Sequence, residues 1–188
     1  MGKHPAKRPA VFIDRDGTLI REKNYLSKIR DVRLIAGAVE ALKLLRRAGY
    51  ALIMVTNQSG IGRGYFTEEQ LRKVHLHLSA LLKKKGAALD AIYYCPHHPD
   101  EDCKCRKPGL GMVNAAKKEF NLDLRRSYAV GDHTNDFLLG QNMGGKGIFV
   151  LTGHGRRERK KIESSKGELS PDKTFRNLFA AAKWIARQ

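Results

Sequence analysis

Short apolar runs alternate with amphipathic segments along the chain, and this alternation sets the expected fold. Each run is almost continuously hydrophobic and rich in Val, Ile, Tyr or Phe, which is typical of parallel strands buried on both faces. The expected strands cover residues 10–14, 50–57, 91–95, 127–132 and 147–152. Apolar residues at helical spacing fill the segments between them, and the expected helices cover residues 37–48, 67–85, 112–120, 135–143 and 174–186.

The regular alternation of strands and helices predicts an α/β fold with a doubly wound, mostly parallel sheet. The helix expected over 67–85 has the clearest boundaries, because Thr67 and Gln70 have the spacing of a capping box and Gly86 follows as a stop. We expect one domain over 1–188, with a basic tail at 1–9, a charged connection at 154–173 and a C-terminal helix at 174–187.

Polar residues gather where the apolar runs end. In a parallel sheet of this kind, ligands bind beyond the carboxyl ends of the strands. We therefore expect one functional site along this edge of the sheet. The residues at these positions are Asp14, Asp16, Thr56, Cys95 and Asp132.

The composition supports a folded protein. Hydrophobic residues make up 41% of the 188-residue chain, which is typical of a globule and argues against extensive disorder. No apolar run reaches the roughly 20 residues that a transmembrane helix needs, so we expect no membrane span. The first residues lack the apolar segment of a secretory signal, and the expected location is the cytoplasm.

The net charge of +17, from 36 Lys and Arg against 19 Asp and Glu, admits two classes of partner. One is nucleic acid, and the other is a phosphorylated metabolite. Residues 153–188 hold ten basic and four acidic residues, and the basic run 156–161 lacks the interleaved aromatic residues that stack on bases. We expect a solvated basic surface there. A nucleic-acid 3′-phosphatase, or a basic nucleic-acid-binding protein, is the alternative from another class.

Two aspartates, Asp14 and Asp16, follow the first expected strand and precede a glycine turn. A spacing of two places both side chains on one side of an extended chain, where one carboxylate can attack an electrophile while the other transfers protons. The alternative is a solvated Asp-Gly turn with no catalytic role.

The string DRDGT over 14–18 resembles the D-x-D-G-T signature of the haloacid dehalogenase (HAD) phosphohydrolases. The resemblance implies that Asp14 attacks phosphorus to form an aspartyl phosphate and that Asp16 is the general acid and base. It also implies that the Thr56 hydroxyl holds the transferring phosphoryl group and that Lys107 stabilises the transition state.

A second acidic motif, Gly131-Asp132 followed by Asp136, resembles the last motif of the same superfamily. The resemblance implies that Asp132 binds Mg²⁺ together with Asp14 and the backbone carbonyl of Asp16. Mg²⁺ is a hard cation that prefers such oxygen ligands.

All three cysteines of the chain lie within one loop, residues 95–105. Cys95, His97, Cys103 and Cys105 form the pattern C-x-H-x5-C-x-C, and three thiolates with one imidazole complete a tetrahedral zinc site that has no open position. We expect a structural Zn²⁺ that fixes this loop and directs the two cations that follow it into the site. The alternatives are reduced free thiols or a redox sensor.

Longer strings resemble one family within the superfamily, the D,D-heptose 1,7-bisphosphate phosphatases. They are TNQSGIGRGYFT over 56–67 and CPHHP with CKCRKP over 95–108, within a similarity that covers about residues 9–153. The resemblance implies Mg²⁺-dependent removal of the 7-phosphate from a heptose bisphosphate by a monomer with small capping loops and a structural Zn²⁺. It places substrate contacts at Arg15, Glu22, Tyr25, Asn57, Gln58, Ser59 and Arg106.

The sequence also departs from the family pattern. Asn24 stands where a glycine usually precedes Tyr25, and residues 133–135 replace a segment that commonly begins with lysine. Histidinol-phosphate phosphatases share the zinc loop and the catalytic set and are the nearest alternative, although the segment GIGRGYF over 60–66 favours the heptose family.

Three further histidines carry weaker signals. His75 and His77 lie in the helix expected over 67–85 with no Cys or Asp spaced to share a metal, and we interpret them as ordinary helix residues. His133 follows Asp132 directly, and the sequence leaves open whether it contacts the metal site.

Overall fold

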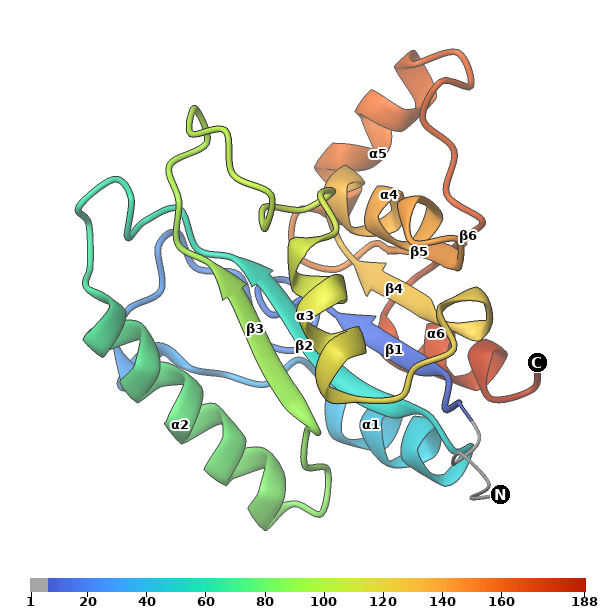
Figure 1. Cartoon of the computed structure of the whole chain (residues 1–188), viewed down its shortest axis with the longest axis horizontal. Helices are drawn as coiled ribbons and strands as arrows, with labels where there is room; N and C mark the ends of the chain where they lie inside the picture. Colours follow the sequence, from blue (N-terminus) through green and yellow to red (C-terminus); the bar gives the residue numbers. More distant parts are fainter. Residues whose placement is uncertain (1–6) are drawn as a thin grey trace.

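A computed structural model of the chain describes residues 7–188, so most of the basic tail expected at 1–9 lies outside the described residues. Its centre is a six-stranded sheet in the order β3-β2-β1-β4-β5-β6, in which every pairing is parallel (Figure 1). The predicted doubly wound α/β fold is confirmed. The strands are β1 (Ala10–Ile13), β2 (Ala51–Asn57), β3 (Ala91–Cys95), β4 (Tyr128–Gly131), β5 (Lys146–Val150) and β6 (Lys173–Phe175).

Helices fill most of the connections between these strands. In residues 7–188, none of them is both long enough and apolar enough to span a membrane. The α-helices are α1 (Ala38–Arg47), α2 (Glu68–Lys84), α3 (Gly111–Glu119), α4 (Thr134–Asn142), α5 (Gly155–Ser164) and α6 (Leu178–Ile185), and the 3₁₀-helices are η1 (Ile29–Asp31) and η2 (Leu124–Arg126).

The central strands are buried on both faces because successive side chains point to opposite sides of the sheet. Val11 and Ile13 of β1 belong to an apolar cluster with residues of α1, α2 and α6. Ala10 and Phe12 of the same strand belong to a second cluster with residues of α3 and α4. Figure 1 shows the corresponding layers, with α3 on one side of the sheet and α1 and α6 on the other.

The α2 helix begins where its capping box was predicted. The Thr67 hydroxyl accepts a hydrogen bond from the Gln70 backbone N–H at 3.2 Å, and the Gln70 side chain accepts one from the Thr67 N–H at 2.8 Å. These bonds satisfy two backbone donors that would otherwise lack partners at the helix start.

The polar stretch at 154–173 contains a helix, so the expectation of a plain connection there is wrong for the ten residues of α5. Ile162 is the one strongly apolar residue of this helix, so the sequence has no hydrophobic stripe from which the helix could be predicted. Its buried contact is polar instead, because the fully buried Glu158 carboxylate accepts a hydrogen bond from the Thr134 hydroxyl of α4 at 3.4 Å. The same carboxylate pairs with the exposed Lys161 ammonium of its own helix at 2.5 Å.

The C-terminal helix begins later than residue 174. Thr174 and Phe175 lie in β6 opposite Phe149 and Val150 of β5. After this short strand the Asn177 side chain accepts a hydrogen bond from the Ala180 N–H at 2.9 Å and so caps α6. A three-residue strand is too short to appear as an apolar run, which is why the sequence assigned it to the helix.

The direction of strand addition reverses beside β1. The chain adds β2 and β3 on one side of β1, and then β4, β5 and β6 on the other. A crevice for ligands opens at such a reversal, beyond the carboxyl ends of the strands. The segments that follow β1, β2 and β4 meet at this crevice.

Candidate active site

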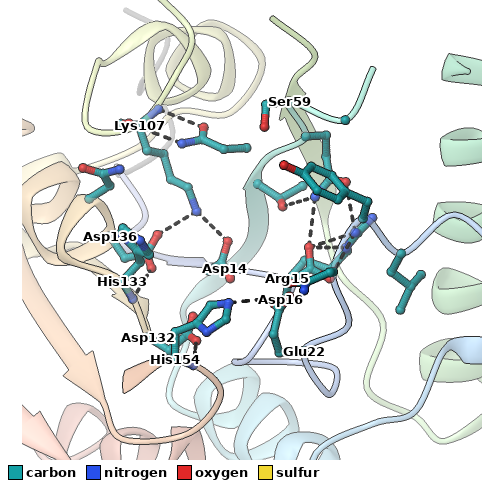
Figure 2. Close-up of a pocket in the computed structure, with 18 of the residues that line it drawn as sticks. Asp14, Arg15, Asp16, Glu22, Ser59, Lys107, Asp132, His133, Asp136 and His154 are labelled. Atoms are coloured by element: carbon teal, nitrogen blue, oxygen red, sulfur yellow. Dashed lines mark hydrogen bonds and ion pairs between the residues drawn. The ribbon is translucent and has the colours of Figure 1, made fainter. Parts of the chain in front are cut away.

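A cavity of about 440 Å³ opens at the carboxyl ends of the central strands (Figure 2). The structure brings to this one cavity every residue predicted to catalyse, to bind substrate or to bind Mg²⁺. These residues are Asp14, Arg15, Asp16, Glu22, Tyr25, Thr56, Asn57, Gln58, Ser59, Arg106, Lys107 and Asp132.

The Lys107 ammonium group lies between the carboxylates of Asp14 and Asp136 (Figure 2). Its Nζ is 2.6 Å from Asp14 Oδ1, 2.7 Å from Asp136 Oδ1 and 2.9 Å from the carbonyl oxygen of Val55. Burial lowers the pKa of Lys107, but the negative charges of Asp136 and Asp14 outweigh it and raise the pKa above its usual range. The lysine is therefore a fixed cation beside Asp14.

Asp14, Asp132 and Asp136 form a buried cluster whose carboxylate oxygens lie within 4.8 Å of one another. Burial, with repulsion from Asp136 and Asp16, raises the pKa of Asp14 to about 7 although Lys107 opposes the rise. Burial and the charges of Asp14 and Asp136 raise the pKa of Asp132 to about 9. A divalent cation would relieve this repulsion, and the oxygen donors fit a hard ion such as Mg²⁺.

Glycines bring the backbone close to this cluster. Gly17 has φ +77°, and a Cβ there would lie 2.1 Å from Asp132 Oδ2. A Cβ at Gly153 would lie 2.2 Å from the same oxygen. The N–H of His154, the next residue, donates a 2.6 Å hydrogen bond to Asp132 Oδ2. Only glycine fits both positions without displacing the carboxylate.

Asp16 faces a different set of partners from Asp14. Its two oxygens each accept a hydrogen bond from the Arg15 guanidinium at 3.0 Å. Gln58 Nε2 donates to the same carboxylate at 3.0 Å and to the Thr56 hydroxyl at 2.8 Å. The two aspartates of the motif thus have separate environments, one beside a lysine and acids, the other beside an arginine and an amide.

Asn57 connects the end of β2 to the loop that carries the lysine. Its side-chain oxygen accepts a 3.0 Å hydrogen bond from the Lys107 N–H, and its side-chain nitrogen donates to the Lys107 carbonyl at 3.3 Å. This pairing fixes the backbone of Lys107 relative to the strand. The geometry therefore gives Asn57 a positioning contact in addition to its place in the cavity wall.

Arg106, which lines the cavity, has a guanidinium nitrogen without a hydrogen-bond partner in residues 7–188. This nitrogen, Nη1, is buried. A buried guanidinium nitrogen without a partner is unfavourable, and a hydrogen-bond acceptor from a ligand can complete it. A phosphate oxygen is such an acceptor.

The outer part of the cavity combines an acid, a histidine and a tyrosine that packs on a second ring outside the lining. Burial, with repulsion from Asp16, raises the pKa of Glu22 to about 7. His154 Nε2 lies 3.6 Å from Glu22 Oε1. Tyr25 adopts φ +52° and packs edge-on against Tyr65 with ring centroids 4.6 Å apart. The sequence prediction included Glu22 and Tyr25, but not the other two residues.

Two histidines near the site have distinct roles in the structure. His154 lines the cavity, and its place just beyond the fifth apolar run was the signal that could have identified it. His133 also lines the cavity but stands outside the cluster of possible metal ligands found in residues 7–188. Its backbone N–H caps α4 by donating to Asp136 Oδ2 at 2.9 Å.

The four predicted zinc ligands come together beside the cavity. The Sγ atoms of Cys95 and Cys103 are 3.5 Å apart, those of Cys103 and Cys105 are 3.8 Å apart, and His97 Nδ1 is 3.2 Å from the Cys105 sulfur. A tetrahedron with zinc–sulfur bonds of about 2.3 Å has edges of roughly 3.8 Å, so the cluster is compatible with zinc. His98 points elsewhere, because its Nδ1 accepts from the Asp100 N–H.

Known proteins similar to this chain match it over nearly its whole length. Profiles described as haloacid dehalogenase-like hydrolase and HAD-hydrolase-like match residues 11–85 and 104–179. The chain is 41% identical over 186 residues to a D-glycero-beta-D-manno-heptose-1,7-bisphosphate 7-phosphatase of Yersinia pestis, covering 94% of this chain and 95% of that protein. It is 39% identical over 156 residues to a D-glycero-alpha-D-manno-heptose-1,7-bisphosphate 7-phosphatase of Photorhabdus laumondii, covering 79% and 85%.

Solved structures agree with the sequence relatives. A crystal structure of D,D-heptose 1,7-bisphosphate phosphatase from B. bronchiseptica, complexed with magnesium and phosphate, matches with a TM-score of 0.83 at 30% identity. The match covers 95% of this chain and 98% of that one. The corresponding structure from Burkholderia thailandensis matches with a TM-score of 0.71 at 27% identity, covering 96% and 100%.

Proposed function

The chain belongs to the haloacid dehalogenase-like hydrolases, and on that premise we propose that it removes the 7-phosphate from a D-glycero-D-manno-heptose 1,7-bisphosphate. The observation that carries the proposal is the separation of two carboxylates at the end of β1. Asp14 lies beside Lys107 in the buried acidic cluster, whereas Asp16 is held by Arg15 and Gln58. Hydrolysis through a covalent intermediate needs one carboxylate that attacks and another that moves protons.

In the first proposed step, a carboxylate oxygen of Asp14 attacks the phosphorus of the 7-phosphate. The bond between phosphorus and the sugar oxygen breaks, and Asp16 donates its proton to that leaving oxygen. Lys107 and the Thr56 hydroxyl stabilise the negative charge of the transferring phosphoryl group. The products of this step are an aspartyl phosphate and the free sugar hydroxyl.

In the second step, water attacks the aspartyl phosphate while Asp16 takes a proton from it. The acyl–phosphate bond breaks, inorganic phosphate leaves, and Asp14 is regenerated. One residue can serve as acid and then as base because the first step leaves Asp16 ionised and ready to accept a proton.

Asp14, Asp132 and the backbone carbonyl of Asp16 are the proposed Mg²⁺ ligands. The donor set fits, since the buried carboxylates repel one another and carry raised pKa values. When bound, Mg²⁺ supplies charge that offsets the phosphate and the nucleophilic carboxylate. Cys95, His97, Cys103 and Cys105 are the proposed ligands of a structural Zn²⁺.

Substrate contacts are proposed for the remaining cavity residues. The unpaired Nη1 of Arg106 supports a contact to a phosphate oxygen. Glu22, Tyr25 and Ser59 line the part of the cavity where a sugar would lie. The relatives include phosphatases named for either anomer, so the preferred anomer is a property to be measured.

The test is phosphate release from a panel of phosphomonoesters with and without Mg²⁺. The panel contains both anomers of the heptose bisphosphate, histidinol phosphate, hexose phosphates, nucleotides and a DNA 3′-phosphate. We expect a heptose bisphosphate to give the highest kcat/KM and Asp14→Asn to abolish release. Preference for histidinol phosphate or DNA would overturn the substrate assignment, and Mg²⁺-independent release would overturn the mechanism.

We also propose that the chain acts as a monomer in the cytoplasm. In support, all residues assigned to the reaction line one cavity of a single chain. Size-exclusion chromatography with light scattering measures the mass of the protein in solution, which should be that of one chain. Cell fractionation should place the protein in the cytoplasm.

A further inference from the structure

We propose that His75, a residue of α2 outside the catalytic cavity, positions the carboxylate of Asp16 by holding the Arg15 guanidinium. This inference rests on the proposed role of Asp16 as proton donor to the leaving group. The contact spans two elements far apart in the sequence, because His75 and Arg15 are separated by 60 residues.

The first link is the hydrogen bond between His75 and Arg15. His75 Nε2 lies 3.1 Å from Arg15 Nη1, and His75 is only 7% exposed. A guanidinium can only donate, so Nε2 accepts and the proton of the neutral ring sits on Nδ1. Burial, then the charge of Arg15, lowers the pKa of His75 to about 3, and the ring therefore stays an acceptor in the neutral range.

The second link is the fork between Arg15 and Asp16. Arg15 is 1% exposed, and its Nε and Nη2 atoms donate to the two oxygens of Asp16. Nη2 also donates to Gln58 Oε1 at 3.0 Å. With His75 on Nη1, the buried guanidinium is held on every nitrogen. These contacts direct Arg15 toward protein groups, which favours positioning over the substrate contact that the family resemblance implied.

The third link is the packing that fixes the histidine ring. The ring of His75 packs edge-on against Tyr94 of β3, with centroids 5.8 Å apart. Neighbouring residues of the same helix, Val74 and Leu78, are buried in the core. The accepting nitrogen of His75 is thus held by a packed helix. It fixes the Arg15 guanidinium, which in turn fixes the Asp16 carboxylate. Bidentate pairs of this kind fix orientation as well as charge.

Loss of the acceptor would leave Arg15 Nη1 buried without that partner. The guanidinium would then rotate toward other acceptors, and Asp16 would lose its fixed orientation. Proton donation matters most when the leaving oxygen is strongly basic, as in an alkyl phosphate. It matters little for p-nitrophenyl phosphate, whose leaving group is stable as an anion. A defect that acts through Asp16 must therefore depend on the leaving group.

The experiment compares kcat/KM for these two kinds of substrate, because kcat/KM covers the step in which the leaving group departs. The alkyl phosphate is the best sugar phosphate found in the panel above. We expect His75→Phe to lower kcat/KM about tenfold for the sugar phosphate and less than about twofold for p-nitrophenyl phosphate. His75→Gln keeps an acceptor within reach of Arg15 and restores the sugar-phosphate value to within about threefold of wild type.

His77→Phe is the matched control, since His77 is exposed on the same helix. It should leave both substrates unchanged. Equal losses on the two substrates in His75→Phe, or no loss at all, overturn the inference. If His75→Phe does not fold, His75→Asn replaces it, because the shorter side chain falls short of Arg15 and should give the same selective loss.

Asp16→Asn separates this inference from the proposed function. A sugar-phosphate activity that survives Asp16→Asn overturns the assigned role of Asp16 itself. A large loss in Asp16→Asn combined with wild-type behaviour in His75→Phe overturns only the positioning role of His75.

Discussion

The Lys107 ammonium group contacts three parts of the site, the Asp14 carboxylate, the Asp136 carboxylate and the Val55 carbonyl. It neutralises part of a buried acidic cluster, and it lies beside the proposed nucleophile. Removing one member of a buried charged pair leaves the other member without compensation.

We expect Lys107→Met to lower kcat at least about a hundredfold, because the transferring phosphoryl group loses a fixed cation. The free energy of unfolding should fall by about 3 kcal/mol in EDTA. Mg²⁺ should recover part of this loss, since it offsets the same carboxylates. Lys118→Met, at an exposed position on α3, is the control. Denaturant unfolding with and without Mg²⁺ measures the effect, and an unchanged unfolding free energy would contradict it.

His75 makes the free energy of unfolding depend on pH, with lower stability at lower pH. Its pKa is about 3 in the folded protein, whereas a histidine in an unfolded chain titrates near pH 6.5. Below about pH 6.5 the unfolded chain therefore binds a proton that the folded chain excludes. Stability from the neutral ring is complete above that pH and decreases as the pH falls toward 3. Between pH 8 and pH 5 the loss is about 2 kcal/mol.

His75→Gln should remove this dependence. The difference in unfolding free energy between the variant and wild type should move by about 2 kcal/mol in favour of the variant from pH 8 to pH 5. Chemical denaturation at the two pH values measures it, with His77→Gln as the exposed control. A difference that is the same at both pH values would show that His75 titrates as an ordinary exposed histidine.

The limits of sequence reasoning at this scale are visible in the histidines. Asp14, Asp16 and Asp132 were predictable because they lie where apolar runs end, and Asp16 and Asp132 each adjoin a glycine. His75 was interpreted as an ordinary helix residue, because its partner Arg15 lies 60 residues away and no spacing rule connects them. His154 lies just beyond the fifth apolar run, but it was missed because it does not itself end that run and its cavity position depends on the packing of the β5–α5 segment.

At the scale of elements, the loop between β3 and α3 must hold two cations in fixed positions, although it has no regular secondary structure to stabilise it. It carries Arg106 and Lys107 to the cavity, yet it contributes only partly buried side chains around its cysteines. A bound metal would replace the missing apolar core of the loop, because metal binding in such small sites supplies folding free energy.

His97→Ala and His98→Ala provide a matched pair for the loop. We expect His97→Ala to reduce bound zinc from about one ion per chain to near zero and to lower kcat/KM about tenfold or more, as the loop and its cations lose their position. His98→Ala should retain both zinc and activity, since His98 Nδ1 bonds to the Asp100 N–H. Elemental analysis and steady-state kinetics on the same samples measure the two effects. Equal zinc contents in the two variants would contradict the ligand assignment.

The elements that were predicted and those that were not differ in the source of their stability. The five longer strands are buried on one or both faces, so their apolar runs were visible in the sequence. The α2 helix was visible through its cap and its stripe. In contrast, the buried polar side chain of α5 is Glu158, whose carboxylate accepts a hydrogen bond from the Thr134 hydroxyl of α4 at 3.4 Å, and β6 depends on pairing with β5. Tertiary contacts of this kind leave no periodic pattern.

At the scale of the whole molecule, the positive charge exceeds what the cavity uses. The net charge is +17, whereas the cavity wall contains aspartates and a glutamate as well as cations. On α5, the side chains of Arg156, Arg157, Arg159 and Lys160 are exposed. This helix is a solvated basic surface at the edge of the molecule.

We expect the charge to give only weak, non-specific attraction to nucleic acid. Binding to duplex DNA should disappear near about 100 mM salt, because few counterions are released in such contacts. Fluorescence anisotropy over a salt series measures it, and a variant with Arg156, Arg157, Arg159 and Lys160 changed to Gln should weaken the residual binding at low salt. Binding that persists at physiological salt with a steep salt slope would support a nucleic-acid function instead.

The contact between Asp14 and Lys107 joins residues that are synthesised at different times. Asp14 emerges from the ribosome early, but Lys107 follows 93 residues later, and Asp136 later still. A growing chain therefore carries its proposed nucleophile without the lysine and the acids that complete the site. Reaction with phosphorylated metabolites must wait at least until α4, which carries Asp136, has been made. A product that ends before Lys107 therefore lacks part of the proposed site, and we expect it to be inactive.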